Sequence, residues 1–173
     1  MDALTSNTGH LLWSGIVPES RAAAIRDRMM ASDLFSGWGI RTMSSRDAGY
    51  NPIEYHNGTV WPHDTAIIAE GLRRYGFRDD ASRVAWALFE AAEEFGYRLP
   101  EVFAGYDRAA SIVAVEYPTA SRPQAWAAAA PLLAIRTILG LEADAGRVTS
   151  KPSLPQPITR LRLVPADSPG TSG

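Results

Sequence analysis

Two long stretches rich in glycine, proline and aromatic residues interrupt a chain that otherwise has helical patterns, and they constrain the fold more than any other feature. Residues 33–62 and 97–121 lack helical periodicity. An irregular stretch of this length inside a compact domain is usually functional or disordered. Because the first stretch is rich in aromatic residues, we expect it to be ordered and functional.

The remaining segments predict five helices. Apolar residues recur at helical spacing, and glycines follow several of the segments, as is typical of helix ends. The predicted helices span residues 5–15, 18–32, 64–75, 79–95 and 123–139. The last is apolar on nearly every side, which predicts a helix that is buried over most of its surface.

Beyond the last helix, Val148 and residues 158–163 predict a small β hairpin. Residues 164–173 are rich in proline, serine and glycine and are expected to be a disordered tail. The chain is therefore predicted to be all-α, with one domain over residues 1–163. Helix pairs that alternate with long loops favour an α/α toroid or a solenoid, and the lack of a fixed sequence period disfavours the regular repeat families.

Composition excludes several function classes. The chain has a net charge of −2, a single lysine (Lys151) and no basic cluster, which argues against a nucleic-acid partner. It has no cysteine, and its three histidines lack metal-ligand spacing, so we expect neither a metal nor another cofactor. No apolar run is long enough to span a bilayer, and the N-terminus lacks a signal-peptide pattern, so we expect a cytoplasmic protein without a membrane partner.

Glu101 is the candidate catalytic residue. It follows Pro100 in a short loop after the fourth predicted helix, with Leu99, Val102 and Phe103 around it. Partial desolvation by these neighbours would tune the carboxylate for work on a bound water. Spacing alone does not distinguish this role from that of an ordinary surface glutamate.

The candidate binding residues mix aromatic and polar side chains, which is the composition of a sugar pocket. They are Arg41, Tyr55, His56, Trp61, Asp64 and Trp126. Four of them have a structural alternative: Trp61 and Trp126 as core residues, Asp64 or its neighbour His63 as a helix cap, and Arg41 in a buried ion pair without a ligand.

Six segments in this order resemble one family, the C-terminal part of amylo-α-1,6-glucosidase or glycogen-debranching-like glycosidases. The resemblance covers roughly residues 1–163, and the ordered set is specific although no single motif is. The segments are Asp2–Trp13, Leu34–Thr42, Tyr55–Asp64, Arg98–Glu101, Tyr117–Ala120 and Pro123–Trp126.

The resemblance implies the C-terminal half of an (α/α)6 barrel of the six-hairpin glycosidase type. It also implies inversion at α-glucosidic linkages of glycogen-like glucans, with Glu101 as the general base and Arg41, His56, Trp61 and Trp126 around the sugar. The general acid, an aspartate, would lie upstream of Met1, so we expect the chain alone to be inactive or weak. An upstream chain that supplies the other half of the barrel would be its partner.

Two alternatives remain at this level. The first is a non-catalytic helical module that binds an oligosaccharide or a partner chain through the same aromatic loops. The second is a helical scaffold without a ligand.

Overall fold

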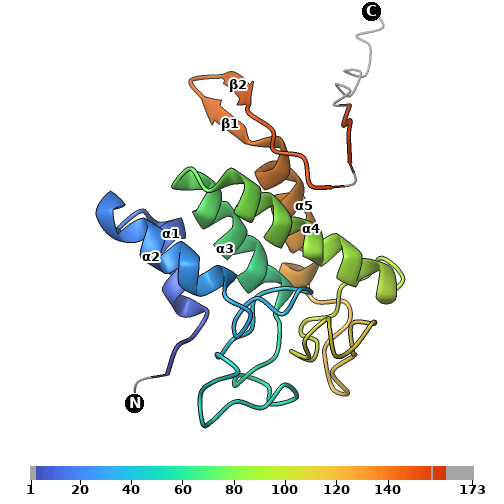
Figure 1. Ribbon diagram of the computed structural model, residues 1–173. Helices are drawn as coiled ribbons and strands as arrows, with labels where there is room; N and C mark the ends of the chain where they lie inside the picture. The colour runs from blue at the N-terminus through green and yellow to red at the C-terminus, as the bar shows by residue number, and fades with distance from the viewer. Residues whose placement is uncertain (1–2, 157, 163–173) are drawn as a thin grey trace, which may run out of the picture.

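Five α-helices and one short β hairpin make up the part of the chain that the structure describes (Figure 1). This computed structural model describes residues 3–156 and 158–162. The prediction of a mostly helical chain with a small hairpin is confirmed. The elements are α1 (Asn7–Ser14), α2 (Glu19–Met30), α3 (Pro62–Arg74), α4 (Arg78–Glu94), α5 (Ala125–Leu139), β1 (Leu141–Asp144) and β2 (Arg147–Ser150).

Helix α3 is the centre of the arrangement, because it packs against α1, α4 and α5, while α2 packs against α1. Two buried clusters hold these helices together. The first joins Leu12 of α1 to Ile68 and Leu72 of α3. The second joins Leu88 of α4 to residues of the long loops, among them Phe103. The loops therefore share the hydrophobic core with the helices.

The contact between α1 and α3 depends on a glycine. A Cβ atom at Gly71 of α3 would lie 2.7 Å from the backbone nitrogen of Trp13 and 3.0 Å from Cβ of Leu12. Glycine in the middle of a helix costs conformational entropy. Here it allows the backbones of the two helices to approach closely.

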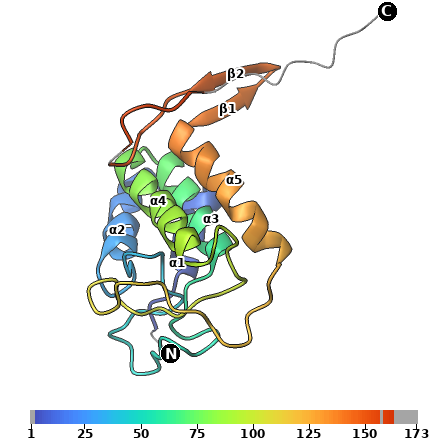
Figure 2. The same cartoon turned by 90° about the vertical axis from the view of Figure 1, so that its right-hand side faces the viewer.

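The two long loops lie together at one end of the helices, opposite the hairpin (Figures 1 and 2). One isolated β-bridge, Val60 with Phe103, ties the two loops together, and two more hold each loop in shape: Arg41 with Val60 in the first and Phe103 with Glu116 in the second. Val60 and Phe103 exchange two backbone hydrogen bonds, of 2.9 and 3.0 Å. The expectation of an ordered first loop is confirmed, because backbone pairing fixes it without regular strands.

The first turn of α3 differs from the prediction. The helix begins at Pro62, whose fixed φ suits a first helical position, and Trp61 is the N-cap residue without a side-chain capping bond. His63 and Asp64 therefore lie inside the first turn. The interpretation of either as a helix cap is wrong.

The position predicted for the hairpin is correct only for Val148, which lies in its second strand. Its strands are Leu141–Asp144 and Arg147–Ser150, joined by Ala145 and Gly146 at φ values of 45° and 80°. Such a turn needs positive φ at both central residues, and the alanine gives little sign of it in the sequence. Residues 158–162 form no strand. Residue 163 and the predicted tail, 164–173, lie outside the described residues.

Helix α5 is less buried than its composition predicts. Ala127, Ala130, Ala134 and Ile138 face the core. On the other side Leu132 is 71% exposed and Ile135 is 44% exposed. This apolar face is open because α3 and α4 cover only one side of the helix. The expectation of burial over most of its surface is wrong for the described chain.

Candidate active site

Backbone pairing of the two loops brings the candidate residues together. Val60 of the first loop pairs with Phe103 of the second, and Tyr55 of the first loop contacts both Trp61 and the carboxylate of Glu101. The sequence separates Trp61 from Glu101 by 40 positions. The loops, rather than a helix, therefore position the candidate carboxylate.

Glu101 is buried and held by several donors. Its side chain is 8% exposed. The backbone N–H of Ser121 donates to one carboxylate oxygen at 3.2 Å, and Nε2 of Gln124 donates to the other at 3.3 Å. Burial alone would raise the pKa of Glu101, but hydrogen bonds from Ser121, Tyr55 and Gln124 outweigh it and hold the pKa below its usual value. The carboxylate is therefore ionised at neutral pH.

Aromatic side chains form a continuous cluster beside Glu101. His63 stacks on Trp126 with ring centroids 4.2 Å apart, and Trp126 meets Trp61 edge to face at 5.9 Å. His56 stacks on Trp61 with ring centroids 5.5 Å apart, and the ring of Tyr55 meets Trp61 edge to face at 4.8 Å. Four of the predicted binding residues thus lie in one cluster, although up to 71 positions separate them in the chain.

A pocket of about 440 Å³ lies at this cluster, between the start of α1 and the start of α3. Four predicted residues line it, and neither Glu101, Tyr55 nor Arg41 is among the lining residues. The lining residues are Thr5, Ser6, Asn7, His10, Thr42, His56, Trp61, His63, Asp64 and Trp126.

The pocket contains a histidine that sequence reasoning gave no role. Nε2 of His10, on α1, hydrogen-bonds Oδ1 of Asp64, on α3. This bond raises the pKa of His10, although burial partly opposes the rise. The neighbouring His63 has a lowered pKa, mainly because burial disfavours its charged form. His10 lies in a segment that carries the family resemblance, which was the available signal for it.

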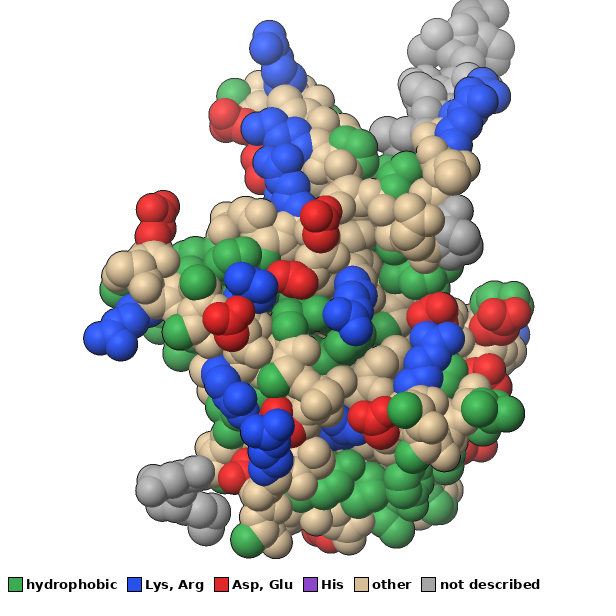
Figure 3. Space-filling model, viewed as in Figure 1, with side chains coloured by type: hydrophobic (Ala, Val, Ile, Leu, Met, Phe, Trp, Pro, Cys, Tyr) green, Lys and Arg blue, Asp and Glu red, His purple; other side chains and the backbone are tan. Residues whose placement is uncertain are grey.

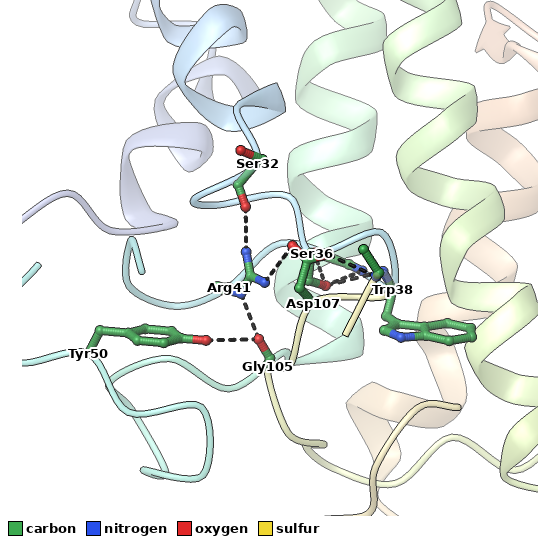
Figure 4. Close-up of polar contacts among 9 residues, drawn as sticks. Ser32, Ser36, Trp38, Arg41, Tyr50, Gly105 and Asp107 are labelled. Carbon is green, nitrogen blue, oxygen red and sulfur yellow. Dashed lines mark hydrogen bonds and ion pairs between the residues drawn. The ribbon is translucent and has the colours of Figure 1, made fainter. Parts of the chain in front are cut away.

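Arg41 lies in a buried ion pair, the structural alternative to a sugar contact (Figure 4). Its guanidinium group is 2% exposed and donates to the carbonyl oxygens of Gly105 at 2.6 Å and Ser32 at 2.7 Å. It also pairs with Asp107 at 3.2 Å. Tyr50 donates to the same carbonyl of Gly105 at 3.0 Å. Arg41 joins the two loops in the described structure, and its contact with a sugar stays a prediction.

The described residues offer little for a metal. Within them, no group of three or more histidine or acidic side chains has a geometry that would hold an ion. On the face shown in Figure 3, acidic and basic side chains are interspersed over the helices rather than gathered in one basic patch. No helix in the described part of the chain has the length and apolarity needed to cross a bilayer.

Two relatives of this chain are mannosylglycerate hydrolases. The chain is 32% identical over 89 residues to a mannosylglycerate hydrolase of Rubrobacter radiotolerans, over 48% of this chain and 20% of that protein. It is 27% identical over 85 residues to mannosylglycerate hydrolase MGH1 of Selaginella moellendorffii, over 49% of this chain and 17% of that protein. The matched part thus spans a fifth or less of these relatives.

A solved structure shares the fold. An uncharacterized conserved protein from Thermus thermophilus superposes with a TM-score of 0.61 at 20% identity, over 78% of this chain and 32% of that one. The resemblance to glycogen-debranching-like enzymes is confirmed only as a resemblance to a glycosidase family. The family model of the mannosylglycerate hydrolase MGH1-like glycoside hydrolase domain matches residues 5–145. The chain belongs to that family of glycoside hydrolase domains.

Proposed function

We propose that the chain is the base-bearing part of an inverting glycosidase, with Glu101 as the general base. The setting of Glu101 carries this proposal. The carboxylate is buried beside the aromatic cluster, and its donors keep its pKa low. An ionised carboxylate can take a proton from an attacking water, whereas a general acid needs a raised pKa. Glu101 is therefore suited to the role of the general base.

The proposed substrate is a short glycoside of the mannosylglycerate type. Family membership and the names of the relatives support it. A volume of about 440 Å³ also lies within the range of small-molecule pockets. A glycogen-like α-glucan is the second candidate. It is favoured by Trp126, which is 45% exposed at the pocket and leaves room for further sugar units.

We also propose that residues 1–163 form part of an (α/α)6 barrel whose general acid comes from a segment outside this chain, carried by an upstream partner chain. The row of α1, α3 and α5, with α4 packed against α3 and α5, supports this arrangement. The open apolar face of α5, with Leu132 and Ile135, is a surface that further helices would cover.

Glu101→Gln tests the proposal, with Glu94→Gln as its matched control because Glu94 is an exposed glutamate of α4. Purified chains are incubated with mannosylglycerate and, separately, with maltooligosaccharide. Released sugar is measured and its anomeric configuration is followed by NMR. Because the proposed general acid lies outside this chain, the incubations are made without and with the acid-bearing partner chain, and we expect full activity only with it. With the partner present, wild type and the control should release the inverted anomer, and Glu101→Gln should lose about two orders of magnitude or more.

The non-catalytic alternative gives a different result. A module that only binds oligosaccharide would retain affinity in calorimetry but release no sugar, and Glu101→Gln would change nothing. Release that survives in Glu101→Gln would contradict the assigned base.

A further inference from the structure

His10 is a polar group of the pocket to which nothing above gives a chemical role. Its side chain is 36% exposed, so a ligand can reach the ring. Nε2 is occupied by Asp64. The other ring nitrogen, Nδ1, has no hydrogen-bond partner among residues 3–156 and 158–162. Asp64 therefore holds Nε2 of His10, and Nδ1 can bind a ligand.

The environment of Asp64 suits a residue that orients the side chain of His10 rather than one that binds a ligand itself. Its side chain is 9% exposed, and its second oxygen, Oδ2, is buried without a hydrogen-bond partner among the residues that the structure describes. A carboxylate in such a place loses solvation, which the bond to His10 offsets only in part. Although Asp64 lines the pocket, its Oδ2 is buried and its Oδ1 is bonded to His10, so the imidazole of His10 is the more open of the two groups.

The ring of His10 is also held in place relative to the stacked rings of His63 and Trp126. Asp64 directly follows His63, whose ring stacks on Trp126. One turn of α3 thus supplies both the apolar stacking surface and the carboxylate that orients His10. Sugar pockets need such an apolar surface with a few polar groups directed at hydroxyls.

We propose that His10 binds a hydroxyl group of the sugar through Nδ1, and that Asp64 is a positioning residue that acts through His10. The inference rests on the proposed carbohydrate site and deepens it. As an imidazolium, His10 donates from Nδ1 to a sugar oxygen. As the neutral ring with its proton on Nε2, it accepts from the sugar hydroxyl. A neutral pyranose is therefore a suitable ligand in either protonation state.

The substitution His10→Gln should weaken sugar binding without disturbing the fold. The amide nitrogen of glutamine can replace Nε2 as the donor to Asp64, but glutamine has no group in the place of Nδ1. We expect a melting temperature close to that of wild type and an affinity for mannosylglycerate about fivefold to tenfold weaker, which is the value of one hydrogen bond. In His10→Asn the contact with Asp64 is lost, so the melting temperature also falls.

Deoxy sugars identify the contact. Methyl α-mannopyranoside and its monodeoxy analogues are titrated into wild type and His10→Gln. One analogue should bind wild type about fivefold to tenfold more weakly than the parent sugar. For His10→Gln, the affinity for this analogue should equal the affinity for the parent sugar. Adding Asp64→Asn to His10→Gln should cause no further loss of affinity.

Where sugar binding is observed, the results separate the proposal for His10 from that for Glu101. Equal affinity of wild type and His10→Gln for every sugar would overturn the role of His10 and leave that of Glu101 intact. Binding lost in His10→Gln but kept in Glu101→Gln supports His10 independently of catalysis. If wild type binds none of these sugars, the His10 proposal fails together with the carbohydrate site.

Discussion

Glu70→Ala should strongly destabilise the protein, because the buried carboxylate of Glu70 pairs with Arg73 of the same helix, α3, and accepts a hydrogen bond from Thr137 of α5. Glu70 is 0% exposed. Arg73 donates to both of its oxygens, from Nη2 and Nε, each at 2.7 Å, and Thr137 of α5 donates at 2.9 Å. Removal of the carboxylate leaves a guanidinium group with 10% exposure and a hydroxyl without their main acceptor.

Breaking a buried pair by removing one partner costs about 3–5 kcal/mol. Arg73 keeps one contact, with the exposed Glu142 at 3.0 Å, so we expect the lower end of this range. In a chain of this size that loss lowers the melting temperature by roughly 6–12 °C. Thr137→Val removes one hydrogen bond and should cost only about 1 kcal/mol.

The assay is urea denaturation followed by circular dichroism, with Glu94→Ala as the surface control. Burial would raise the pKa of Glu70, but Arg73 and Thr137 outweigh it and lower the pKa. The stabilisation by the charged carboxylate is therefore complete above the unfolded pKa of about 4.5 and is lost as the pH falls through the folded pKa. Glu70→Gln should thus differ from wild type most at neutral pH. A Glu70→Ala protein within about 1 kcal/mol of its control would refute the reasoning.

Three further predictions concern packing, the loops and the pocket. Gly71→Ala forces α1 away from α3, because the new Cβ would meet the backbone of Trp13 at 2.7 Å; it should cost about 1–3 kcal/mol in chemical denaturation, and an unchanged midpoint would contradict this. Arg41→Lys cannot satisfy both carbonyl groups and the carboxylate that Arg41 holds; it should cost about 2 kcal/mol in the same assay, whereas full stability would mean that the loops hold together without the guanidinium. Trp126→Ala removes the stacking partner of His63; we expect roughly tenfold weaker sugar binding in calorimetry with little loss of stability, since Trp126 is 45% exposed, and unchanged affinity would exclude the ring from the sugar site.

The helices could be predicted from the sequence because their signals are local. Gly15 and Gly140 end α1 and α5 in the left-handed conformation, as glycine after a helical pattern indicates. The hairpin could not be placed in this way, because Ala145 adopts a positive φ that its side chain does not favour. The exposed face of α5 could not be foreseen either, since composition shows that a helix is apolar but not which neighbours cover it.

The site depended on long-range pairing, which the sequence reveals only in part. Tyr55, His56 and Trp61 are close in the chain, so their clustering could be foreseen. Arg41 could not be placed, because its acceptors include Gly105, which lies 64 positions away.

The proposed role of His10 could not be predicted from the sequence either, because it depends on a contact between residues far apart in the chain. Its partner Asp64 lies 54 positions away on another helix. No spacing rule relates residues on two helices whose contact depends on close backbone packing at Gly71. The carboxylate of Asp64 is conspicuous in the sequence because it opens a helix beside aromatic residues. In the structure it is covered, and the exposed group is the imidazole that it holds. Polar residues found by local pattern therefore need not be the ones that meet a ligand, and in this pocket the imidazole of His10 is more open than the carboxylate that the pattern singles out.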